Sequence, residues 1–147
     1  MKTILTPVDF SPATQHVVDA AVKLASGGGA EIVLFHVIQP PMVTSDYGLA
    51  MENVQEILEI SEKAATRQLS HLGDSLGQQG VLVRTEQISG AAVASINDMA
   101  RKVDADYIVL GSHGHGSVYE LLVGSTTHGV LKDAPCPVLV VPPKKEK

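Results

Sequence analysis

The stretch YIVLGSHGHGSVYELLVGSTTHGVLK, residues 107–132, decides how this chain folds. Residues 107–110 are apolar and predict a buried strand that ends at Gly111, and residues 125–132 predict a short helix. The segment contains Gly111, Gly114, Gly116 and Gly124. We expect all four to allow positive φ angles and the close approach of a ligand. A helix N-terminus carries free N–H donors and about half a positive charge, so this unit predicts an anion site, for phosphate above all.

The same alternation of strand and helix runs through the rest of the chain. Short apolar runs predict five strands, at residues 3–8, 31–38, 81–88, 107–110 and 137–141. Amphipathic stretches predict the helices between them, the first with Ser11 as N-cap and Pro12 at its first position, the others at residues 49–76, 90–103 and 125–132. The pattern indicates an α/β fold, an open five-stranded parallel sheet with helices on both faces. The strand at residues 81–88 is the more polar one, which predicts a place near an edge.

The composition fits one domain in the cytoplasm. The 147 residues are 44% hydrophobic, so we expect a single domain over residues 1–147. A net charge of −5, with acidic and basic residues interspersed, argues against a nucleic-acid surface. No apolar run approaches the ~20 residues of a membrane helix, and the first residues lack the pattern of a signal peptide. The one cysteine, Cys136, excludes an intrachain disulfide and is interpreted as a buried, inert thiol.

The glycine segment matches neither of two familiar phosphate-binding motifs. A P-loop needs a Gly-Lys dipeptide, and the chain has none. The run from Gly114 ends at Tyr119, where the dinucleotide fingerprint requires a glycine or alanine. The three arginines are expected in helices or strands away from the loop, at Arg67, Arg84 and Arg101. With neither arginine nor general base beside the loop, the sequence favours binding over efficient phosphoryl transfer.

Four segments together resemble the ATP-binding form of the universal stress protein family. Its glycine signature is a glycine, two residues, a glycine, nine residues, a glycine and a serine or threonine, and it fits Gly111, Gly114, Gly124 and Ser125. The segments TPVDFS (6–11), HVI (36–38) and APCPVLVV (134–141) resemble its first strand, the end of its second strand and its last strand. The matches run in order over essentially the whole chain.

This resemblance implies the adenine nucleotide alpha hydrolase-like strand order 3-2-1-4-5, with a switch point that sets Asp9 opposite Gly111. It implies ATP, ADP or AMP as the ligand, and Mg²⁺ held through water by Asp9. Adenine and ribose would lie against Pro7, Val8, Asp9 and Val37, and ribose and phosphates against Gly111, Ser112 and Gly114. Phosphates would be held by Gly124, Ser125, Thr126 and Thr127, with His113 as a further candidate. A homodimer through the strand from Pro137 to Val141 is also implied.

Three functions stay open at this point. The favoured one is a regulatory or stress-response protein that binds ATP and hydrolyses it slowly at most, so we do not expect an efficient enzyme. The alternatives are a genuine ATPase or nucleotidyl-transfer enzyme on the same fold, and a dimeric interaction module that binds no nucleotide. Asp9 is favoured as a binding carboxylate over a phosphoryl-accepting nucleophile, because the chain has no Asp-Asp pair.

Some further features have simpler explanations. His113 and His115 are a poor metal pair, because no carboxylate or cysteine lies near them in the sequence. The glycines at residues 27–29 predict the end of a helix rather than a second phosphate loop. Residues 39–48 predict a long loop that serves either as a lid or as an ordinary crossover.

Overall fold

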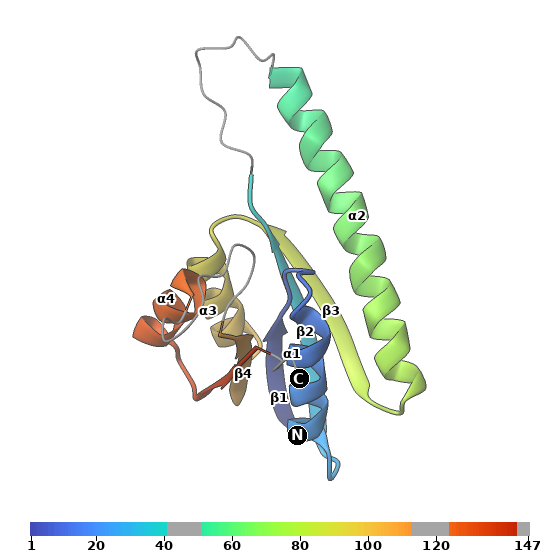
Figure 1. The fold of residues 1–147 in the computed structure, drawn as a ribbon, viewed down its shortest axis with the longest axis vertical. Coiled ribbons are helices and arrows are strands. Elements are labelled where there is room, and N and C mark those ends of the chain that lie inside the picture. The colour runs from blue at the N-terminus through green and yellow to red at the C-terminus, as the bar shows by residue number, and fades with distance from the viewer. Residues whose placement is uncertain (41–50, 113–123, 144–147) are drawn as a thin grey trace.

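The computed structural model describes residues 1–40, 51–112 and 124–143. Five parallel strands form one sheet in the order β3-β2-β1-β4-β5 (Figure 1). The strands are β1 Lys2–Pro7, β2 Ala30–Ile38, β3 Leu82–Ser89, β4 Tyr107–Gly111 and β5 Val138–Val141. The predicted α/β class and strand order are confirmed, and β3 lies at an edge as its polar sequence predicts.

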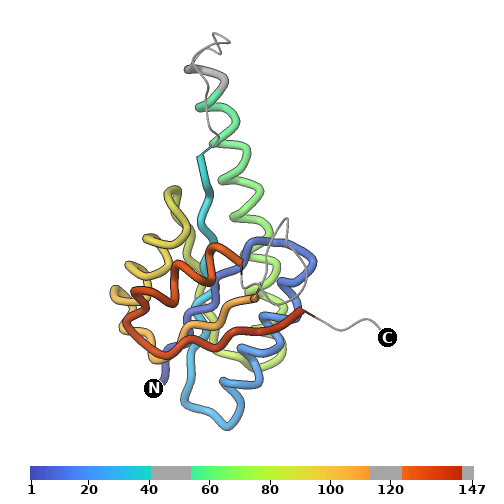
Figure 2. The backbone as a smooth tube through the Cα atoms, turned by 60° about the vertical axis from the view of Figure 1, so that its left-hand side comes forward, coloured from blue at the N-terminus to red at the C-terminus, as the bar shows by residue number. Residues whose placement is uncertain are grey.

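Helices cover both faces of this sheet, as predicted. They are α1 Thr14–Ala25, α2 Met51–Gln78, α3 Ala92–Lys102 and α4 Ser125–Asp133. Alternate strand residues supply two cores: Ile4, Ile32 and Leu34 pack with α1 and α2, whereas Leu5, Val33 and Phe35 pack with α3 and α4. Burial on both faces explains why the inner strands are apolar almost throughout. The first turns of α2 extend beyond the sheet (Figures 1 and 2).

The start of α1 differs from the sequence prediction. The helix begins at Thr14 rather than Pro12, because residues 11–14 form a turn in which the Thr14 N–H donates to the Ser11 carbonyl at 3.0 Å. The Ser11 hydroxyl accepts from the Ala13 N–H at 3.3 Å, so Ser11 caps this turn rather than the helix. At the other end of α1, Gly27, Gly28 and Gly29 have φ angles of +102°, +86° and +73° and lead into β2. They lie at the amino edge of the sheet, away from the glycine segment that follows β4.

The fold places the ends of β1 and β4 side by side. The two strands pair with Ile4 against Tyr107 and Leu5 against Ile108. The chain leaves β1 towards α1 on one face and leaves β4 towards α4 on the other. This divergence is the switch point at which parallel α/β sheets bind ligands. If the register of β1 and β4 continues past the paired residues, Val8 lies level with Gly111. Asp9, which the resemblance set opposite Gly111, follows one residue later.

Candidate functional site

The turn between β1 and α1 closes on its own side chains. The exposed Asp9 follows the strand, and its Oδ1 accepts from the Ser11 N–H at 2.9 Å. The Thr14 hydroxyl donates to the same oxygen at 3.4 Å. These bonds fix the carboxylate at the carboxyl edge of the sheet and use backbone and hydroxyl donors at the start of α1.

Phe10, next to Asp9, has a rare backbone conformation. Its φ of +59° is unusual for a bulky side chain and costs about 1–3 kcal/mol, which the surrounding contacts must offset. The Phe10 ring packs on the His36 ring of β2, with centroids 4.5 Å apart. His36 Nδ1 lies 2.7 Å from the Val8 carbonyl oxygen, and because a carbonyl only accepts, Nδ1 carries the hydrogen. No local pattern in the sequence predicts this pair, because residues 10 and 36 lie far apart along the chain.

The end of β4 is joined directly to the start of α4. The Ser112 N–H donates to the Val141 carbonyl of β5 at 2.8 Å, and the Gly124 N–H donates to the Ser112 carbonyl at 2.7 Å. The Thr127 hydroxyl donates to the Gly111 carbonyl at 2.7 Å. The structure therefore brings together four residues that the sequence predicted for phosphate binding, although they are separated by up to 16 positions.

The N-terminus of α4 is capped by a residue without a side chain. Gly124 is the N-cap, no side-chain hydrogen bond to the cap is found in the described part of the chain, and the helix ladder begins with the His128 N–H donating to the Gly124 carbonyl at 2.9 Å. The N–H groups of Ser125, Thr126 and Thr127 precede that first bond, so no helical carbonyl accepts from them. N–H donors at the positive end of a helix dipole favour an anion, and here they lie at the switch point.

Two details correct the sequence analysis. Gly124 has φ −58° and ψ 156°, an extended conformation open to any residue, so positive φ is not the reason for glycine there. Gly111 is an ordinary β4 residue paired with Val141. Thr127 is only 3% exposed, and its hydroxyl donates to the Gly111 carbonyl, so the hydroxyl is already used within the protein.

The other predicted residues take simple positions. Pro7, Val8 and Asp9 follow one another at the end of β1, and Val37 is a half-buried residue of the adjacent β2, packed on the α3 and α4 side. His113 and Gly114, like the pair His113 and His115, lie outside the described residues, as does most of the predicted loop at residues 39–48.

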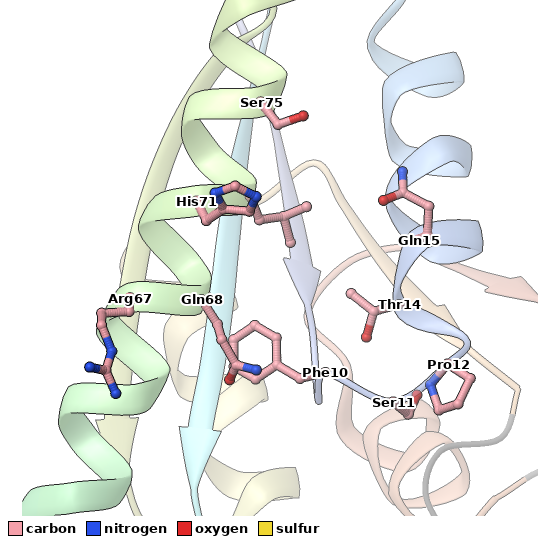
Figure 3. Close-up of a pocket in the computed structure, with 10 residues that line it drawn as sticks. Phe10, Ser11, Pro12, Thr14, Gln15, Arg67, Gln68, His71 and Ser75 are labelled. Carbon is pink, nitrogen blue, oxygen red and sulfur yellow. The ribbon is translucent and has the colours of Figure 1, made fainter.

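The arginines lie in α2, β3 and α3, as predicted. Arg84 pairs with Glu31 at 3.2 Å and Arg101 with Asp133 at 3.0 Å. Arg67 lines a groove of about 680 Å³ between α1 and α2, together with Phe10, Thr14 and His71 (Figure 3). Among the described residues, no three His, Cys, Asp or Glu side chains group as a metal site, and no helix is long and apolar enough to cross a membrane.

Comparisons with known proteins agree with this geometry. The family model described as the universal stress protein family matches residues 1–142. Universal stress protein MJ0531 of Methanocaldococcus jannaschii is 31% identical over 147 residues, which cover 99% of this chain and 85% of that protein. The structure of MJ0577, from the same organism, has a TM-score of 0.85 at 28% identity and covers 99% of this chain and 98% of its own. UspA from Lactobacillus plantarum has a TM-score of 0.84 at 28% identity, over 95% and 97% of the two chains.

Two more distant structures contain nucleotides. One universal stress protein is a complex with cAMP, with 20% identity, a TM-score of 0.68 and 95% coverage of both chains. A family protein from Arabidopsis thaliana has AMP bound, with 13% identity, a TM-score of 0.70 and coverage of 98% of this chain and 93% of its own. At these identities they show the shared fold.

Proposed function

The chain belongs to the universal stress protein family, and on that premise we propose that it binds ATP or another adenine nucleotide at the carboxyl edge of β1 and β4. The single observation that carries the proposal is the start of α4, where a glycine N-cap leaves three successive N–H groups without a helical partner. The cAMP and AMP complexes of two structural neighbours support the class of ligand.

Each side of the switch point would hold one part of the nucleotide. Gly124, Ser125, Thr126 and Thr127 would bind phosphates through backbone N–H groups, with Gly111, Ser112, His113 and Gly114 beside ribose and phosphates. Pro7, Val8, Asp9 and Val37 would lie against adenine and ribose. Asp9 is exposed at the carboxyl edge of the sheet, and a carboxylate beside phosphate oxygens suits Mg²⁺ held through water.

We further propose a regulatory or stress-response role in the cytoplasm, with slow hydrolysis at most. Arg84 and Arg101 are ion-paired with acidic side chains of the protein, and none of the three arginines belongs to the α4 site. A true ATPase or nucleotidyl-transfer enzyme would turn over at about 1 per second or faster. Phosphate release at that rate under saturating Mg-ATP would replace this proposal with the enzymatic one.

The last strand, β5, offers an edge for homodimer formation. It lies at the end of the sheet, and its Leu139 side chain is 41% exposed. Such an apolar edge strand favours pairing with a second copy. Light scattering after gel filtration should show a dimer, and Leu139→Glu should shift it towards the monomer. A wild-type monomer at tens of micromolar protein would exclude a stable dimer through β5.

Thermal melting with and without Mg-ATP tests the nucleotide site. ATP at 100 times its Kd adds about 2.7 kcal/mol, which for a chain of this length raises the melting temperature by about 5–10 °C. Gly124→Val should abolish the shift without unfolding the protein, because its backbone angles suit valine and its side chain would fill space needed by the phosphates. No shift of the wild type at millimolar ATP would leave the non-binding interaction module as the remaining function.

A further inference from the structure

We propose that His36 and Phe10 position Asp9 for the nucleotide, by holding the turn between β1 and α1 from the α1 and α2 face of the sheet. The inference rests on the nucleotide site proposed above and adds two positioning residues to it. Neither residue need touch the ligand, because each acts on Asp9 through the backbone.

β2 holds the chain on both sides of Asp9. On the strand side, the Val8 N–H donates to the Phe35 carbonyl at 2.8 Å, and the Val8 carbonyl accepts from His36 Nδ1 at 2.7 Å. On the helix side, the Phe10 ring lies against the His36 ring at 4.5 Å. Residue 36 therefore contacts both neighbours of Asp9, one by a hydrogen bond and one by ring packing.

The backbone conformation of Phe10 explains why the contacts with His36 are needed. A bulky residue keeps a φ of +59° only where its surroundings determine it. Figure 3 shows the Phe10 side chain in the groove between α1 and α2, with Thr14 on one side and Gln68 and His71 on the other. If the Phe10 ring lost these contacts, residue 10 would relax to negative φ. The turn that carries the Asp9 carboxylate would then change direction.

Asp9 itself reports the state of the turn. Its Oδ1 accepts from the Ser11 N–H at 2.9 Å, a bond that exists only while residues 9–11 keep this conformation. Exchange of the Ser11 amide hydrogen therefore measures the positioning directly, with or without a nucleotide.

The first arm of the test follows that amide by NMR hydrogen exchange. His36→Leu removes the Nδ1 donor and should speed Ser11 exchange by about tenfold, the loss expected for one half-buried hydrogen bond. His36→Asn places an N–H donor the same number of bonds from the backbone but loses the ring contact with Phe10, so it should restore the protection of Ser11 in part. His16→Leu changes a histidine of α1 that is not among the residues lining the groove and is the control, with no change expected. Wild-type exchange in His36→Leu would overturn the proposal.

The second arm compares two ligands by calorimetry. His36→Leu should weaken Mg-ATP about tenfold but leave inorganic tripolyphosphate without Mg²⁺ within about twofold, because metal-free tripolyphosphate needs only the start of α4. His36→Asn should recover part of the ATP affinity, because it restores the donor but not the ring contact. Faster exchange with unchanged ATP affinity, or equal weakening of both ligands, would contradict a role in positioning Asp9.

Two safeguards separate the possible failures. If His36→Leu does not fold, Phe10→Leu tests the same hold, since it removes the aromatic contact but keeps an apolar side chain in the groove. A wild-type protein that binds no ATP would refute the proposed function, whereas the exchange arm would still decide whether His36 fixes the turn.

Discussion

The two helices that begin at the switch point use their first hydrogen bonds in opposite ways. Before α1, the side chains of Asp9 and Ser11 accept from the backbone of the same turn, at 2.9 and 3.3 Å. Before α4, Gly124 offers no side chain, and the N–H groups of Ser125, Thr126 and Thr127 precede the first helical bond. A turn that caps itself presents a carboxylate, whereas a turn capped by glycine presents donors.

The difference gives the two sides of the site opposite electrostatic preferences. The α4 side favours an anion, through its N–H groups and the positive end of the helix dipole. The α1 side presents the negative charge of Asp9, which favours a cation. The proposed ligand, a nucleotide with Mg²⁺ on its phosphates, would satisfy both preferences at once.

The largest effect should come from making α4 resemble α1. Gly124→Asp would cap the first turn with a carboxylate and repel phosphate, so we expect ATP affinity to fall by about 100-fold, the loss of charge-assisted hydrogen bonds. The same change should stabilise the ligand-free protein by up to about 1 kcal/mol, because an acidic N-cap suits the helix dipole. Calorimetry with ATP and melting without it measure the two effects.

Gly124→Asn is the matched control for charge. It caps the helix without a negative charge, so we expect the stability to be kept and the ATP affinity to fall less than with Asp. If Gly124→Asp left ATP binding intact, the phosphates would lie elsewhere and the contrast between α1 and α4 would have no role in binding.

Thr127→Val should have the next largest effect, on stability rather than binding. Its hydroxyl donates to the Gly111 carbonyl, and the residue is only 3% exposed, so removing the donor should cost about 1–2 kcal/mol. ATP affinity should stay within about threefold, since the backbone N–H remains. Thr127→Ser keeps the hydroxyl and should behave like the wild type. A large loss of ATP binding at unchanged stability would instead make the hydroxyl a phosphate ligand.

Thr127 also shows how far sequence reasoning reaches. The glycine spacing and the first helical residues predicted which residues meet at the end of β4, because helix N-termini have the same donors in every protein. The sequence did not predict that the Thr127 hydroxyl bonds to the Gly111 carbonyl or that Gly124 has an extended backbone, because both depend on how α4 packs on the sheet. The contact between Phe10 and His36 is likewise long-range, joining residues of β2 to the turn after β1.

Asp9→Asn should separate the role of Asp9 in the turn from its proposed role in holding Mg²⁺. The amide oxygen can still accept from the Ser11 N–H, so we expect the turn and the stability to persist. ATP should bind about tenfold more weakly with Mg²⁺, but at least as tightly without it, because one negative charge near the phosphates is gone. Asp9→Ala removes the acceptor as well and should also speed Ser11 exchange. If ATP affinity depended on Mg²⁺ equally in Asp9→Asn and in the wild type, Asp9 would have no role in holding the metal.

The smallest effect is expected at the opposite edge of the sheet, at Cys136 before β5. Burial raises the pKa of its thiol, and the nearby Asp106 charge raises it further. Its alkylation by iodoacetamide should therefore rise with pH at a higher midpoint than in the urea-unfolded chain. The neutral thiol is favoured by folding, so stability is unaffected at low pH and falls slightly as pH rises past the pKa of the unfolded thiol. Saturating ATP should not slow the alkylation, because the proposed nucleotide site lies at the carboxyl edge. Protection by ATP would show that the site extends across the sheet, and the contrast between the two helix starts would no longer define it.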